Sequence, residues 1–179
     1  AVIVWPDILG LRPAFESMGK RLAESGYAVL VVNPYYRSAK APVVKEGATF
    51  QDTQVRSTVF PMYRSLSPQT HKTDARAFVA FLDSQAAVDT EKKMGTTGYC
   101  MGGPIVMRTA AAAPTRIGAG ASFHGAGLVS EGPDSPHLQI PKMQAQFLIA
   151  IAQNDDERMP DAKNVLRDEY EKAGLSAEI

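Results

Sequence analysis

Five short runs rich in apolar and β-branched residues recur along the chain, at residues 1–5, 27–34, 94–99, 118–124 and 146–152. The runs do not alternate between apolar and polar positions, as a strand with one face in water would. Continuous apolar runs of this length are typical of strands covered on both faces, as in a parallel sheet. A further strand is expected to open at the last four residues, SAEI.

Amphipathic stretches with helical start and stop signals separate the predicted strands. One stretch places Phe15 and Leu22 on a single face, and another, N-capped by Thr73, is expected to bury Phe78 and Phe81. Alternating strands and helices predict an α/β fold, with a doubly wound, mostly parallel sheet, right-handed crossovers and helices on both faces. The residues that mark the other helix ends are Pro13, Gly26, Pro160 and Gly174.

We interpret residues 1–179 as a single domain without a linker or an internal repeat. Residues 35–70 are rich in Ser, Pro, Thr and Arg and predict a short helix with loops over the sheet edge, and residues 125–144 predict a second long loop. Both ends look cut, because the chain opens inside a buried strand without an initiator Met and closes as another strand begins. The domain is therefore expected to be incomplete at both ends and truncated at its C-terminus.

Composition narrows the class of partner. The chain has 45% hydrophobic and 21% charged residues and no net charge, which is typical of a soluble globular domain with a sizeable core. Lys and Arg are scattered and no apolar run is long enough to span a bilayer, so neither nucleic acid nor a membrane is an expected partner. A small molecule is the expected partner. Neutral charge and scattered apolar residues predict no particular oligomeric state.

The single cysteine, Cys100, excludes an internal disulfide, and no second Cys or His stands at zinc-site spacing. A reducing compartment, by default the cytoplasm, and the absence of a structural metal are therefore expected. The run GAGAS (residues 118–122) lacks the third glycine of a dinucleotide-binding loop and lies inside a predicted strand, so no such cofactor is expected.

Cys100 lies where a predicted strand, MGTTGY, runs directly into a predicted helix, MGGPIVMRTAAAA. The central residue of such a corner is held at positive φ, with its side chain above the sheet, while neighbouring backbones crowd together. Gly98 and Gly102 are then required because a Cβ at either position would collide across the corner. Gly103 lets the new helix pack close to the strand.

Two features favour a nucleophilic thiol at Cys100 over a small buried residue in a tight turn. The helix N-terminus is expected to lower the pKa of the thiol from about 8.5 toward neutrality. The backbone N–H of Met101 is expected to point into the space beside the sulfur and to form half of an oxyanion hole.

The motif GYCMGG after a strand, with WPDILGLRP near the start and AIAQNDDERMP near the end, resembles the dienelactone hydrolase family of the α/β-hydrolase superfamily. The resemblance covers essentially the whole chain, in the family's order and spacing. It implies an α/β-hydrolase fold and a Cys, Asp, His triad that opens small esters or lactones through an acyl-enzyme, as in carboxymethylenebutenolidases, without a cofactor.

The resemblance also suggests the other roles. The triad acid falls on Asp155, although the adjacent Asp156 leaves a one-residue ambiguity, and one of the two is expected to be a solvated helix cap. The second oxyanion donor falls on the N–H of Ile8. Asp7 stands where the family carries a Glu that touches the resting thiol, and the shorter side chain either changes how the thiol is held or caps the loop.

The base is not evident among the three histidines. His71 and His137 are expected to be surface residues. His124 ends the strand that follows the nucleophile helix, at the edge where active sites of open sheets collect, and is a candidate to line the pocket. In the family the catalytic His follows the last strand, so the base is expected beyond Ile179 rather than at His124.

Arg37, after the second strand, is a candidate to bind a substrate carboxylate, and Tyr36 a candidate pocket wall. Two other readings stay open. One is a catalytically inactive hydrolase-fold binding protein. The other is a glutamine amidotransferase-like cysteine enzyme, although the His-x-Glu pair that such enzymes share is absent downstream of Cys100.

Overall fold

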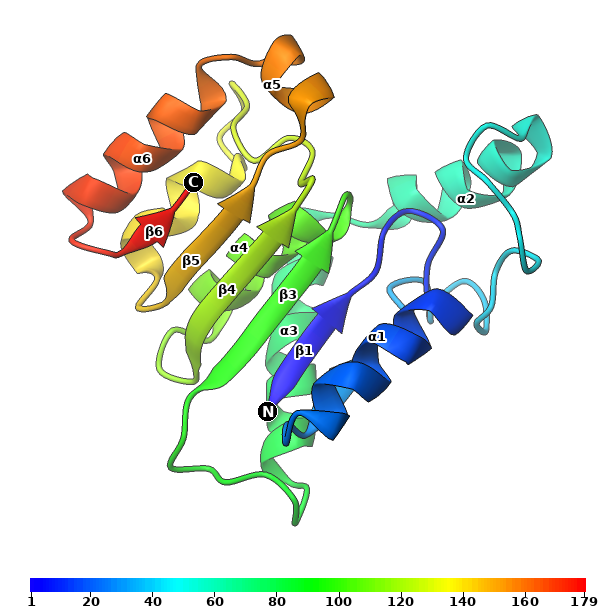
Figure 1. The fold of residues 1–179 in the computed structure, drawn as a ribbon, viewed down its shortest axis with the longest axis horizontal. Helices are drawn as coiled ribbons and strands as arrows, with labels where there is room; N and C mark the ends of the chain where they lie inside the picture. Colours follow the sequence, from blue (N-terminus) through cyan, green and yellow to red (C-terminus); the bar gives the residue numbers. More distant parts are fainter.

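Six parallel strands form one sheet in the order β2-β1-β3-β4-β5-β6 (Figure 1). The computed structural model describes residues 1–179. The strands are β1 (Val2–Trp5), β2 (Val29–Val31), β3 (Met94–Tyr99), β4 (Ile117–Phe123), β5 (Gln146–Ala150) and β6 (Ala177–Glu178). All five predicted strands and the strand opening near the C-terminus are therefore confirmed, as is the parallel α/β class.

Helices lie on both faces of the sheet. α1 lies on one face, against β1 and β2, and α3, α4 and α6 lie on the other (Figure 1). Residues 35–70 contain a longer helix than the sequence predicts, α2, and the predicted loop at 125–144 contains the 3-10 helix η1. The helices are α1 (Pro13–Glu24), α2 (Thr53–Ser65), α3 (Pro68–Asp83), α4 (Gly102–Ala112), η1 (Pro136–Lys142), α5 (Gln153–Arg158) and α6 (Ala162–Lys172).

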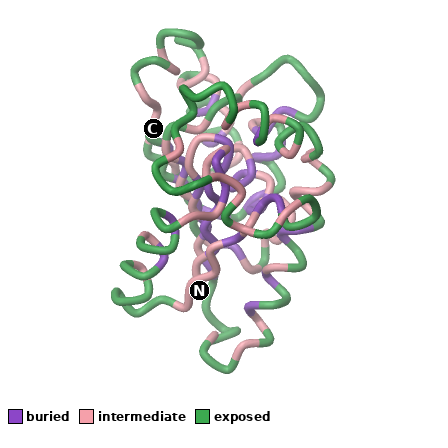
Figure 2. The backbone as a smooth tube through the Cα atoms, turned by 90° about the vertical axis from the view of Figure 1, so that its right-hand side faces the viewer, coloured by how far each residue is buried: buried purple, intermediate pink, exposed green.

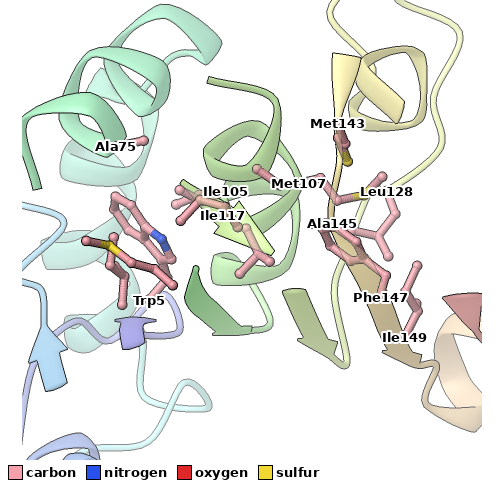
Figure 3. Packing of buried hydrophobic residues seen from close by; sticks show 14 of the residues in the cluster. Trp5, Ala75, Ile105, Met107, Ile117, Leu128, Met143, Ala145, Phe147 and Ile149 are labelled. Carbon is pink, nitrogen blue, oxygen red and sulfur yellow. The ribbon is translucent and has the colours of Figure 1, made fainter. Parts of the chain in front are cut away.

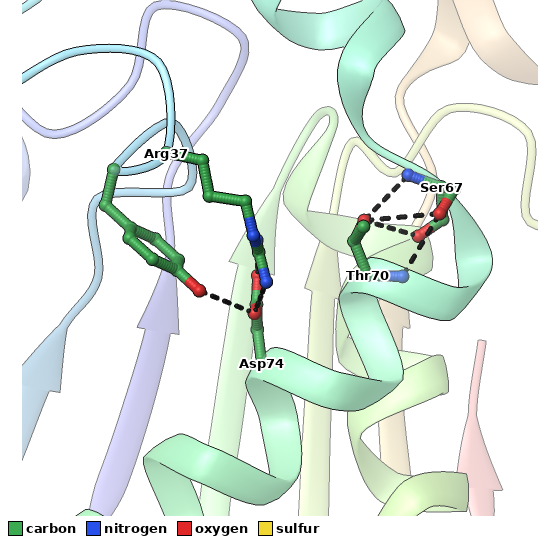
Figure 4. Close-up of polar contacts among 5 residues, drawn as sticks. Arg37, Ser67, Thr70 and Asp74 are labelled. Carbon is green, nitrogen blue, oxygen red and sulfur yellow. Dashed lines mark hydrogen bonds and ion pairs between the residues drawn. The ribbon is translucent and has the colours of Figure 1, made fainter.

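The predicted start of α3 is wrong. Its N-cap is Ser67, whose side chain accepts a hydrogen bond from the Thr70 N–H while the Thr70 side chain bonds back to the Ser67 N–H (Figure 4). This reciprocal pair, followed by Pro68 in the first turn, starts the helix one and a half turns before Thr73. Phe81 of this helix is 51% exposed, not buried as expected.

The core lies between the sheet and the helices α3, α4 and α6. Trp5 of β1 packs toward α3, Ile105 and Met107 of α4 lie over the middle strands, and Phe147 of β5 reaches α6 (Figure 3). In the turned view the buried residues gather along the sheet, and the exposed ones on the outer helices and loops (Figure 2). Burial of these large side chains is the main term that stabilises the sheet-to-helix packing.

Three backbones crowd together at the corner between β3 and α4. A Cβ added to Gly98 would lie 2.3 Å from the Gly102 carbonyl oxygen, and one added to Gly102 would lie 2.4 Å from that of Trp5. A Cβ on Gly103 would lie 2.5 Å from the Ser122 Oγ. No side chain fits at these distances, so the predicted need for glycine at the corner is confirmed.

We predict that Gly98→Ala lowers the free energy of unfolding by at least about 2 kcal/mol, because the added methyl group must displace backbone atoms rather than a flexible side chain. Gly132→Ala is the matched control, since nothing lies within 4 Å of a Cβ there. Urea unfolding of both variants is the measurement. Equal stability of the two variants would contradict the crowded corner.

Candidate active site

Cys100 occupies the predicted corner. Its φ is +53°, in the left-handed region that a non-glycine residue rarely adopts, and it follows β3 and precedes α4. The Cys100 N–H donates to the Phe123 carbonyl at 3.0 Å, which ties the corner to the end of β4. The thiol is half-buried at the carboxyl edge of the sheet. The predicted positive φ is confirmed.

The expected lowering of the thiol pKa is wrong. Burial of the sulfur raises the pKa of Cys100, and the negative charges of Asp7 and Asp155 act in the same direction. The backbone N–H groups of Met101 and Ile8 act against it by hydrogen bonding to the sulfur, without reversing it. The helix N-terminus is therefore present as expected, but loss of hydration outweighs it.

The two amides come from different elements. Met101 directly follows the cysteine, whereas Ile8 lies in the loop after β1. The Tyr35 hydroxyl, which is buried, donates to the Ile8 carbonyl at 2.8 Å and thereby holds this loop. Two N–H groups that converge on one sulfur form a pocket for negative charge on an atom beside it.

Asp7 caps the Ile8 loop. Its Oδ1 accepts the Leu9 N–H at 2.9 Å, and its two oxygens accept the Arg12 guanidinium at 2.7 and 2.8 Å. Asp7 therefore caps this loop, which is one of its two expected roles. It affects the thiol of Cys100 through its negative charge, which raises the thiol pKa. The sequence analysis missed Arg12, whose spacing of five residues from Asp7 was the available signal.

His124 and Asp155 meet at the same edge. His124 directly follows β4 with a φ of +52°, and its N–H donates to the Ala150 carbonyl at 2.9 Å. Its Nδ1 lies 2.5 Å from Asp155 Oδ2. The imidazole is 49% exposed and the carboxylate 17%, and that Oδ2 is buried without an aligned hydrogen bond.

Asp156 points elsewhere. Its Oδ2 accepts the Lys163 ammonium of α6 at 2.7 Å. The adjacent pair therefore separates, with Asp155 toward the sulfur edge and Asp156 toward α6. A cavity of about 220 Å³, lined mainly by apolar side chains such as Leu128, Ile151 and Met159, lies against Asp155.

A family model, the dienelactone hydrolase family, matches residues 1–179. The chain belongs to the dienelactone hydrolase family. The curated carboxymethylenebutenolidase of Rhodococcus opacus is 25% identical over 116 residues, which are 65% of this chain and 40% of that protein. The match therefore spans less than half the length of this relative.

Two solved structures share the fold of this dienelactone hydrolase family member. A putative dienelactone hydrolase from Klebsiella pneumoniae aligns with a TM-score of 0.73 at 20% identity, over 99% of this chain and 71% of that one. A dienelactone hydrolase-like promiscuous phosphotriesterase from metagenomic libraries aligns with a TM-score of 0.70 at 21% identity, over 99% and 66%. The chain has the α/β-hydrolase fold of dienelactone hydrolases, as expected.

Arg37 of this family member is engaged by its own chain. Its guanidinium donates to both oxygens of the buried Asp74, at 2.7 and 2.5 Å (Figure 4). The Tyr36 hydroxyl donates to the same carboxylate at 3.0 Å, and the guanidinium carbon lies 4.6 Å from the centre of the Tyr36 ring. The sequence analysis did not single out Asp74. Its carboxylate pairs with the Arg37 guanidinium, which was expected to bind a substrate carboxylate.

The other two histidines lie away from Cys100. His71 is not the surface residue that was expected, because its Nδ1 lies 3.3 Å from Arg108 of α4 and burial lowers its pKa to about 4. His137 Nδ1 lies 2.6 Å from the Ser135 Oγ. No three His, Cys, Asp or Glu side chains converge in a metal-binding arrangement. No helix combines the length and apolarity that crossing a bilayer requires.

We predict that iodoacetamide alkylates Cys100 with a pH midpoint above about 8.5, the pKa of an ordinary thiol, because burial favours the protonated form. Asp7→Asn should move the midpoint down, since the Asp7 charge opposes the thiolate. Intact mass at successive pH values gives the rate, and the chain's single cysteine makes the signal unambiguous. Asp89→Asn, in an exposed turn, is the control. A midpoint near neutrality would contradict the burial argument.

Proposed function

We propose that this chain carries the nucleophile, oxyanion hole and orienting acid of a hydrolase that cleaves a small ester or lactone through a cysteine acyl-enzyme. One observation carries the proposal: Cys100 is held at positive φ with the N–H groups of Met101 and Ile8 beside its sulfur. A buried structural thiol needs neither the backbone strain nor the two converging amides.

In the first half of the reaction, the Cys100 thiolate adds to the carbonyl carbon of the substrate. The carbonyl oxygen becomes an oxyanion and accepts hydrogen bonds from the Met101 and Ile8 N–H groups. The tetrahedral adduct collapses, the bond to the leaving oxygen breaks, and that oxygen takes a proton from the imidazolium of the base. The product is a thioester on Cys100 and a free alcohol, or an open chain if the substrate is a lactone.

In the second half, water attacks the thioester carbon while the imidazole takes its proton. The same two amides hold the second oxyanion. Collapse breaks the bond to sulfur, the thiolate regains the proton from the imidazolium, and the carboxylic acid leaves. The sum is one ester bond and one water converted to an acid and an alcohol, without a cofactor.

Because the pKa of the Cys100 thiol is raised, the proposed mechanism needs a base that takes the thiol proton. At neutral pH burial favours the protonated thiol, so the resting enzyme holds little thiolate. Formation of the nucleophile then requires an imidazole that accepts the proton when the substrate binds. Asp155, half-buried at this edge with its Oδ2 already 2.5 Å from an imidazole nitrogen, that of His124, is suited to orient a catalytic imidazole.

We assign the base to a histidine that follows the last strand, beyond Ile179. A specific observation favours a second candidate, His124, because its Nδ1 already lies 2.5 Å from Asp155. His124 makes no hydrogen bond to Cys100 in this structure, which favours the first assignment and leaves His124 a place in the pocket wall. Tyr36 and Asp7 border the same end of the sheet.

The proposed substrate class is supported by the family and by the similarity to a protein of Rhodococcus opacus that is named carboxymethylenebutenolidase. Family membership also argues against a glutamine amidotransferase-like enzyme. A binding protein with an inactive hydrolase fold is the outcome if no ester is hydrolysed. The single cysteine agrees with a site in a reducing compartment such as the cytoplasm.

The test is turnover of p-nitrophenyl acetate by the protein expressed from its complete reading frame. We predict that Cys100→Ala abolishes turnover and that Asp155→Asn lowers kcat at least about 100-fold, because the imidazole loses its orienting charge. Asp156→Asn, the adjacent control, should stay within about threefold, since its carboxylate faces Lys163. Turnover that survives in Cys100→Ala would overturn the proposal.

The same assay decides between the two candidate bases. His124→Gln keeps most of kcat if the base follows the last strand, and loses as much as Asp155→Asn if His124 is the base. Folded variants, checked by circular dichroism, are compared in each case.

A further inference from the structure

One buried hydroxyl contacts both residues whose backbone amides face the Cys100 sulfur. The Tyr35 hydroxyl donates to the Ile8 carbonyl oxygen at 2.8 Å, and the same oxygen lies 3.3 Å from the Met101 Sδ. Ile8 lies in the loop after β1, whereas Met101 is the N-cap of α4. A single side chain thus connects the two elements that supply the candidate oxyanion donors.

The order of the strands brings Tyr35 to this place. β1 lies between β2 and β3, so the turn after β2 and the corner after β3 are on opposite sides of the end of β1. Tyr35 lies in the turn after β2, and its long, rigid phenol extends past the loop after β1 to the corner. A buried Tyr hydroxyl normally has a hydrogen-bond partner, and here the partner is the loop that carries one of the amides.

The phenol ring is held from two sides. The Tyr35 N–H donates to the Asn33 Oδ1 at 3.0 Å, and the Asn33 side-chain amide donates to the Ala39 carbonyl at 2.9 Å. On the other side, a Cβ added to Gly10 would lie 3.2 Å from a carbon of the ring. Tyr35 is only 1% exposed. The position of its hydroxyl is therefore set by the turn after β2 and by close packing.

The Tyr35 bond differs from the other hydrogen bonds of the Ile8 loop. Asp7 accepts hydrogen bonds from Leu9 and Arg12, but these bonds stay within the loop and its flank and do not reach Met101. Burial raises the pKa of Tyr35, and the negative charge of Asp7 acts in the same direction. The hydroxyl therefore remains protonated, and able to donate, at neutral and mildly alkaline pH.

We propose that Tyr35 is a positioning residue for the oxyanion hole, whose hydroxyl fixes the Ile8 loop against Met101 so that both N–H groups converge beside Cys100. Hydrogen bonds weaken steeply when the donor turns away from its acceptor, so a small movement of the loop is enough to weaken the Ile8 N–H contact. The consequence for catalysis rests on the proposed function. The consequence for the thiol does not, because the same amides already act on the sulfur of the resting protein.

The first test follows the thiol and requires no hydrolysis. Tyr35→Phe removes the hydroxyl and keeps the buried ring. The amides of Met101 and Ile8 lower the pKa of Cys100 against the larger effect of burial, so weakening their contact should raise it. In protein expressed from its complete reading frame, the pH midpoint of Cys100 alkylation by iodoacetamide, followed by intact mass, is expected to rise by at least about 0.5 pH unit.

Tyr170→Phe is the matched control. Tyr170 is also 1% exposed, and its hydroxyl is buried without a hydrogen-bond partner. Its ring packs against Phe147 near the start of β5, at the end of the sheet opposite to Cys100. The midpoint of this variant should stay within about 0.2 pH unit of that of the unmodified protein. Equal midpoints in Tyr35→Phe and Tyr170→Phe would overturn the proposal.

The second test uses turnover of p-nitrophenyl acetate. Tyr35→Phe is expected to lower kcat at least about tenfold and to leave KM within about twofold, because the oxyanion is absent from the bound substrate and forms in the transition state. Tyr170→Phe should keep kcat. An unchanged kcat in Tyr35→Phe would overturn the positioning role and leave the proposed function intact.

The two tests separate failure of this inference from failure of the proposed function. If the unmodified protein hydrolyses no ester, the proposed function fails and the alkylation midpoint alone decides the role of Tyr35. If Tyr35→Phe does not fold by circular dichroism, Asn33→Ala replaces it, because this change frees the Tyr35 N–H and loosens the phenol. The midpoint is then expected to rise in the same direction, and an unchanged midpoint would contradict the proposal.

Discussion

The close approach of three backbones at the β3–α4 corner is the constraint on which the site depends. Gly98, Gly102 and the Trp5 carbonyl lie too near one another for any side chain. This crowding holds Cys100 at positive φ and brings the loop after β1 within reach of the sulfur. The proposed nucleophile and both proposed oxyanion donors are therefore positioned by packing of the fold.

The same packing sets the protonation state of the thiol. A sulfur close enough to two amides, and shielded enough for them to act strongly, is also a sulfur that loses hydration. Burial then raises the thiol pKa despite the helix N-terminus. In the proposed mechanism, the thiol is protonated at rest, and the thiolate forms when an imidazole oriented by a carboxylate accepts its proton.

Much of this arrangement follows from local sequence. The strand-to-helix corner, the glycines around Cys100 and the parallel direction of the strands are encoded by short-range patterns, and the structure has them as predicted. The N-cap of α3 was also local, but Ser67 with Pro68 is a stronger signal than Thr73 and was overlooked. The predicted direction of the shift in the Cys100 thiol pKa was wrong, because the burial of the sulfur depends on residues distant in the sequence.

Partnerships across elements could not be predicted for the same reason. The contact of His124 with Asp155 depends on the register of β4 and β5, and that of Arg37 with Asp74 on how α3 packs against the loop after β2. Tyr35 supports the Ile8 loop from 27 residues away. The sequence separation of two such residues does not predict their contact, because the contact depends on how distant elements pack in the folded structure.

The most direct measurement is acid-quenched intact mass after brief mixing of the protein, expressed from its complete reading frame, with p-nitrophenyl acetate. The account predicts one acetyl group per chain, located by peptide mapping on Cys100 and lost again as hydrolysis proceeds. An acetyl group on another side chain, or ester turnover without any covalent adduct on Cys100 at any mixing time, would contradict the account.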